Sequence, residues 1–169
     1  MFTTRLVKTI MVASVALCAL LVTFNNLTDY NTNYQFVRHT LIMDTIFPDN
    51  GQKGRAITAP TVWTVSYWAI IAAEAVVGLV LAFAAVQLAA KLRASAASFN
   101  AAKKYAIVGA GLGFALWFTG FMVVGGEWFL MWQSSGWNGQ DAAFHFYMTL
   151  LAVIIFVNQP DGESEPPVR

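Results

Sequence analysis

Three ionisable side chains, Glu74, Glu127 and His145, lie inside long apolar runs of this 169-residue sequence. A charged carboxylate in the middle of a bilayer costs at least about 2.5 kcal/mol, so a carboxyl group at that depth should be protonated, paired or next to water. Two carboxyl groups and one imidazole could form a proton or ion path. They could also provide ligands for a metal ion such as zinc or iron.

Two further interpretations of the same residues stay open. Polar groups in a small membrane bundle can serve only to fix the register of the helices through hydrogen bonds. A lipid or a quinone could also lie among the aromatic side chains. Glu74, Glu127 and His145 have no metal-motif spacing, and a metal site would need further ligands from His39, Met43 or Asp44, of which His39 and Asp44 fit a solvated loop better. The sequence names no cofactor.

The composition predicts an integral membrane protein. Apolar and aromatic residues make up 57% of the chain, whereas charged residues make up 11%, against about 25% in soluble domains. The net charge of +1 argues against nucleic acid as a partner. The sequence also shows no nucleophile and base pair, phosphate loop or cysteine and histidine motif, which argues against an enzyme.

Four apolar segments are long enough to cross a bilayer, which takes roughly 20 helical residues. We therefore expect a single domain, an all-α bundle of four transmembrane helices. A long external loop, 25–60, separates the first two helices and could hold a short interfacial helix near 36–43, and a short tail, 158–169, ends the chain. The four predicted spans are residues 6–24, 61–90, 105–132 and 142–157.

The basic residues predict the orientation of the bundle. Seven lysines and arginines fall on the side of the two termini and three on the other side. Because basic residues concentrate in cytoplasmic loops, both termini are expected in the cytoplasm. The loops 25–60 and 133–141 are then external.

Small residues mark the faces on which the predicted helices pack. At about 100° per residue, Gly109, Gly113, Gly120 and Glu127 fall within roughly 40° of one another. This stripe predicts close packing of the third span and points Glu127 toward a neighbouring helix. The glycines of 109–113 are not a dinucleotide-binding turn, because no strand precedes them.

The second span carries a similar stripe. Tyr67, Glu74 and Gly78 share one face, so Glu74 is expected to point at a neighbouring helix. His145 should lie about one turn inside the fourth span, at a depth similar to Glu127. We therefore predict an intramembrane polar cluster of Tyr67, Glu74, Glu127 and His145, which forms a vestibule open to the external loops.

A family resemblance rests on a few motifs: Asn25-Asn26, Asp29-Tyr30, Asp44-Thr45, Phe47-Pro48, Glu74, the block 125–134 that begins Gly-Gly-Glu-Trp, and Trp137-Asn138-Gly139-Gln140. Over nearly its whole length the chain resembles a bacterial family of predicted small integral membrane proteins. The resemblance implies a bacterial membrane and transfers no activity, cofactor or catalytic residue.

The function expected from the sequence is that of an accessory or structural membrane component. Its partners would be the lipid bilayer and either other membrane subunits or a second copy. The alternative is a small transporter, or a membrane protein that binds a cofactor or metal through Glu74, Glu127 and His145. The sequence specifies no substrate and no oligomeric state.

Overall fold

The computed structural model describes residues 1–162, and within them it contains helices and no strand. The last part of the predicted tail, from residue 163, lies outside the described residues. The long helical elements are α1 (Phe2–Thr28), α2 (Tyr30–Ile42), α3 (Pro60–Ala90), α4 (Ala96–Ala102), α5 (Lys104–Phe114), the π-helix η2 (Ala115–Trp128) and α6 (Gln140–Asn158). Two short 3₁₀ turns, η1 (Lys53–Arg55) and η3 (Met131–Gln133), lie in the connections.

Four helical segments are long and apolar enough to cross a membrane, as the sequence predicts. They are Phe2–Thr28, Pro60–Ala90, Ala96–Trp128 and Gln140–Asn158. The all-α membrane bundle is therefore confirmed. The predicted short helix near 36–43 is longer than expected, because α2 begins at Tyr30 directly after α1.

Local chemistry explains several of the helix ends. Pro60 occupies the first turn of α3, where its missing N–H is no loss. The side chain of Ser95 accepts a hydrogen bond from the backbone N–H of Ser98 and so caps α4. Helix α2 stops at Met43, whose left-handed backbone, with φ of 52°, cannot continue a right-handed helix.

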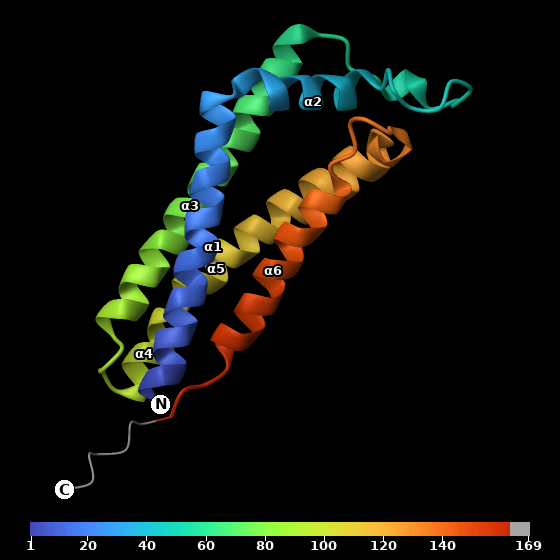
Figure 1. The fold of residues 1–169 in the computed structure, drawn as a ribbon. Coiled ribbons are helices and arrows are strands. Elements are labelled where there is room, and N and C mark those ends of the chain that lie inside the picture. Colours follow the sequence, from blue (N-terminus) through green and yellow to red (C-terminus); the bar gives the residue numbers. More distant parts are fainter. Residues whose placement is uncertain (163–169) are drawn as a thin grey trace, which may run out of the picture.

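The helices form two pairs that diverge toward one end (Figure 1). Helix α1 lies along α3, and the continuous α5 and η2 segment lies along α6. Helix α2 crosses the wide end, which we call the α2 end. The opposite end, where the N-terminus and Gly162 lie, is called the terminal end. The geometry leaves the pairs in close contact at the terminal end and apart beneath α2.

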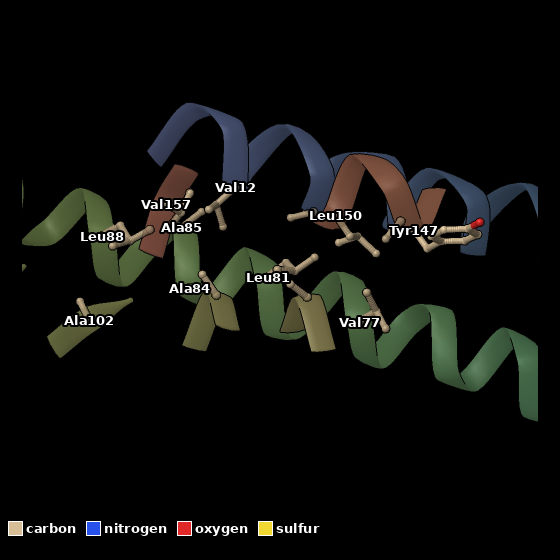
Figure 2. Packing of buried hydrophobic residues seen from close by; sticks show 14 of the residues in the cluster. Val12, Val77, Leu81, Ala84, Ala85, Leu88, Ala102, Tyr147, Leu150 and Val157 are labelled. Carbon is tan, nitrogen blue, oxygen red and sulfur yellow. The ribbon is translucent and has the colours of Figure 1, made fainter. Parts of the chain in front are cut away.

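The apolar core runs along one face of α3 (Figure 2). Val77, Leu81 and Leu88 of α3 are each at most 2% exposed. They pack in one cluster with Val12 of α1 and Leu150 of α6. Burial of one such side chain contributes about 1.5–3 kcal/mol, so this seam holds the two helix pairs together.

Three of the four glycines predicted to mediate packing lie at close helix contacts. A Cβ atom added to Gly78 would come within 2.7 Å of Leu20, one added to Gly109 within 2.7 Å of Leu81, and one added to Gly113 within 2.6 Å of Leu150. Gly120 does not lie at such a contact, contrary to the prediction. It is exposed, and a Cβ atom there would meet nothing within 4 Å.

The π-helix explains the position of Gly120. The prediction assumed the constant rotation of an α-helix, but η2 bonds each residue to the fifth one along and therefore turns less per residue. The small-residue stripe of α5 does not continue beyond residue 115. The buried residues of η2 are instead Trp117, Gly125 and Gly126.

Candidate functional site

Glu74 is buried in the interior of the bundle near the α2 end. It is 2% exposed, and its Oε2 atom accepts a hydrogen bond of 2.6 Å from the side-chain amide of Asn26 on α1. Within residues 1–162 the other carboxyl oxygen has no hydrogen-bond partner. Glu74 therefore points at a neighbouring helix, as its place on the predicted stripe of α3 indicated, and its partner there is Asn26.

Asn26 makes two further hydrogen bonds, one with α2 and one with α3. Its side-chain oxygen accepts a hydrogen bond from the amide of Asn33 on α2. Its backbone carbonyl accepts one of 3.1 Å from the hydroxyl of Tyr67, which is 1% exposed. Hydrogen bonds thus connect polar groups of α1, α2 and α3, and the chain of amides ends on one carboxyl oxygen of Glu74.

A cavity of about 280 Å³ lies beside this cluster. Asn33 is exposed whereas Glu74 is buried, so the cavity leads from the surface at α2 into the bundle. Among residues 1–162, Glu74 is the one carboxyl group in the lining, and no lysine, arginine or histidine of that range lines the cavity. The lining residues are Val22, Asn26, Asn33, Phe36, Val37, Tyr67, Ile70, Glu74, Trp117, Phe121, Gly139, Ala142, Ala143 and Phe146.

Aromatic rings form much of the cavity wall. The rings of Trp117 and Phe146 are stacked, with centroids 4.6 Å apart and an angle of 9° between their planes. The rings of Phe36 and Phe121 are also stacked, at 6.2 Å. The faces of aromatic rings carry partial negative charge. A carboxylate and these rings therefore both favour a cationic ligand.

The other two members of the predicted cluster lie elsewhere. Glu127 is exposed on η2, because the slower rotation of the π-helix turns it away from the bundle. His145 is also exposed, and its imidazole lies 3.9 Å from the carboxyl group of Asp141 one turn earlier in α6. The convergence of Glu74, Glu127 and His145 was therefore a wrong expectation for this geometry.

The positions of Glu127 and His145 away from Glu74 also bear on the metal site that the sequence left open. Within residues 1–162 no group of three or more His, Cys, Asp or Glu side chains is placed to hold a metal ion. His39 and Asp44, proposed as additional ligands, instead pair with each other at 2.9 Å. The His39 ring stacks on Trp137. This pair connects the end of α2 to the loop before α6.

A second buried polar cluster lies at the terminal end. Asp161 is 4% exposed and lies between Lys8 of α1 and Lys103 at the start of α5. The Nζ atom of Lys8 is 2.7 Å from the Asp161 carboxyl, and Lys103 also donates to it. Arg5, 0% exposed, donates to the carbonyls of Leu92, Ala94 and Gly162.

These charges set the titration of Asp161. Burial alone would raise the pKa of its carboxyl group. The hydrogen bonds and positive charges of Lys103 and Lys8 outweigh burial and hold the pKa below its ordinary value. Asp161 is therefore ionised at neutral pH and locks the segment after α6 onto α1 and α5.

Sequence reasoning missed this terminal cluster because it treated the lysines only as topology signals. A usable signal was present. Asp161 is the one acidic residue among positions 1–9, 91–104 and 158–162, the described segments that hold the bases of that end. A single acidic residue in a region with several basic residues is expected to form an ion pair with one of them. Asn33, which completes the Glu74 cluster, lay in the predicted loop and carried no such signal.

The fold and the site together define a membrane-spanning four-helix bundle that buries one carboxyl group beside a cavity. A family model described as predicted small integral membrane protein (DUF2165) matches residues 4–160. The chain belongs to this family, as its sequence motifs indicate. No curated protein and no solved structure matches the chain.

Proposed function

We propose that this protein binds an ammonium-bearing molecule with an apolar body, and that Glu74 accepts the ammonium group. The supporting observation is that Glu74 lines the cavity and that one of its carboxyl oxygens has no partner among the described residues. A buried carboxylate needs compensation of its charge in addition to hydrogen bonds, and the amide of Asn26 is neutral. The lining supplies no cation, so the guest is the natural source of one.

The rest of the cavity fits the same class of ligand. Aromatic rings attract a cation that lies over their faces, by about 0.5–2 kcal/mol per contact. The apolar lining accommodates the hydrocarbon part of the molecule. A volume of about 280 Å³ exceeds the engineered cavity of about 150 Å³ that holds benzene, so one small aromatic amine has room.

The direct test is binding of benzylammonium to the purified protein in detergent at pH 7, measured by calorimetry, with benzyl alcohol as the uncharged comparison. We expect benzylammonium to bind at least tenfold more tightly than the alcohol. Glu74→Gln should remove that preference because glutamine keeps the shape and loses the charge. Glu127→Gln, a matched change at an exposed carboxyl outside the cavity, should leave it intact.

Two results would overturn the proposal. Equal affinity for benzylammonium and benzyl alcohol would show that the carboxyl group does not recognise charge. An unchanged preference in Glu74→Gln would place the binding site elsewhere. In either case the Asn26 and Glu74 pair would be left with the structural role of fixing helix register.

The sequence-based hypothesis of an accessory subunit is kept as a second proposal. Glu127 and His145 lie on spanning segments and are exposed in a single copy of the chain. Polar groups that face lipid are expensive, and a partner helix would cover them. The mass of the particle extracted from native membranes tests this role, and a mass equal to one chain would contradict it.

For orientation we propose cytoplasmic termini in a bacterial inner membrane, supported by the distribution of lysine and arginine. Single cysteines at Asn50 and at Ser98 in a Cys18→Ala background report on opposite sides. An impermeant thiol reagent added to intact cells should label position 50 and spare position 98. The reverse pattern would contradict this orientation.

A further inference from the structure

A second cavity of about 300 Å³ adjoins the one at Glu74. It lies between α2, α3 and η2, where the two helix pairs diverge beneath α2 (Figure 1). Four residues, Phe36, Val37, Ile70 and Phe121, line both cavities, which makes the two immediate neighbours. We call the second cavity the α3/η2 groove.

The α3/η2 groove differs from the Glu74 cavity in its chemistry. Thr40 and Ser66 contribute the polar side chains of its lining, and the remaining lining residues are apolar or glycine. No ionisable side chain of the described part of the chain lines it. Such a surface gains free energy by covering a hydrocarbon and offers nothing to a charged group.

The π-helix produces this groove. Gly120 lines the groove, and a Cβ atom at that position would meet nothing within 4 Å. Continued close packing of the kind seen at Gly113 would fill this space, but η2 changes the rotation of the segment just before Gly120. π-Helical segments occur frequently at functional sites.

We infer that the ligand of the Glu74 site is a long-chain amine, with its ammonium group at Glu74 and its hydrocarbon chain in the α3/η2 groove. This inference rests on the proposed function and narrows its ligand class. A phospholipid fits less well, because neither lining holds a lysine or arginine to meet a phosphate. A membrane is also where an amine with a long chain accumulates, since its chain partitions into hydrocarbon.

The test is a series of n-alkylammonium ions, from butyl to decyl, kept below the concentrations at which they form micelles. If the chain enters the groove, affinity should rise by about fourfold for each added methylene until the groove is full. Detergent also takes up longer chains, so the informative quantity is the difference between variants in the same detergent.

Gly120→Leu provides that difference. Gly120 lines the α3/η2 groove and a side chain has open space there, so we expect the leucine to narrow the groove. We expect it to weaken decylammonium binding at least tenfold and to leave benzylammonium binding unchanged. Gly111→Leu is the matched control, because Gly111 also has nothing within 4 Å and lines neither cavity.

The outcomes separate the two proposals. Failure of wild type to bind benzylammonium contradicts the proposed function. Normal benzylammonium binding with equal decylammonium affinity in wild type and Gly120→Leu overturns the long-chain inference alone. If Gly120→Leu does not fold, Ser66→Leu closes the groove from the opposite wall and is read in the same way.

Discussion

At the terminal end of the bundle, Asp161 lies between two lysines, and almost all polar atoms are hydrogen-bonded. At the α2 end, Glu74 is equally buried but has one partner, Asn26, and a cavity on its other side. The two carboxyl groups thus differ in what compensates their charge. Lys8 and Lys103 do so for Asp161, and for Glu74 we propose that the bound ligand does.

This difference teaches how burial relates to function in a small membrane bundle. A buried ion pair stabilises a fold only when both partners stay, because removal of one leaves an uncompensated charge. A buried carboxyl group beside a cavity contributes less to the stability of the fold and more to the recognition of a ligand. We therefore expect substitutions at the two ends to separate stability from binding.

The largest expected effect is that of Asp161→Asn. Without the carboxylate, Lys8 and Lys103 have no acidic partner among the described residues, and loss of one member of a buried pair typically costs about 3–5 kcal/mol. Denaturant unfolding in detergent measures this loss. Asp141→Asn is the control, because that side chain is 92% exposed and should change stability by less than about 0.5 kcal/mol.

If both variants unfold like wild type, the terminal cluster does not hold the bundle together. The two ends would then differ in appearance and not in energy.

Low pH should cause part of the loss of stability that is expected for Asp161→Asn. The pKa of Asp161 is lower in the folded protein than its ordinary value, which is about 3.9 in an unfolded chain. The stabilisation is therefore complete above pH of about 4 and is lost as the pH falls through the lower, folded-state pKa. Unfolding measured between pH 6 and pH 2 should show this loss in wild type, and Asp161→Asn should show less of it. Parallel curves for both proteins would contradict the assignment.

Of the two buried carboxyl groups, Glu74 is expected to give the smaller effect on stability when it is replaced by its amide, in Glu74→Gln. Glutamine keeps an oxygen that accepts from Asn26, so the free energy of unfolding should change by less than about 1 kcal/mol. Glu74→Leu sharpens the comparison, because it leaves the buried Asn26 amide without its acceptor and should cost about 1–3 kcal/mol. A loss of 3 kcal/mol or more in Glu74→Gln would mean that the α2 end depends on charge as the terminal end does.

The sequence determined the membrane class, the helical fold and the four spans. Long apolar runs with few charges have one stable solution in a bilayer, since helices satisfy their own backbone hydrogen bonds. It also determined that Glu74 faces the interior, because α3 is regular and rotation along a regular helix can be counted from the sequence.

Only the tertiary structure decided what Glu74 meets. The rotation counted from the sequence predicted the wrong face for Glu127 and Gly120. The reason is that η2 is π-helical, so its smaller rotation per residue accumulates over its length. The partnerships of Asn26 with Glu74 and of Asp161 with Lys8 join residues 48 and 153 positions apart in the chain. Such contacts depend on how whole helices approach one another. The divergence of the two helix pairs, which opens the cavity, is a property of that packing and of no single segment.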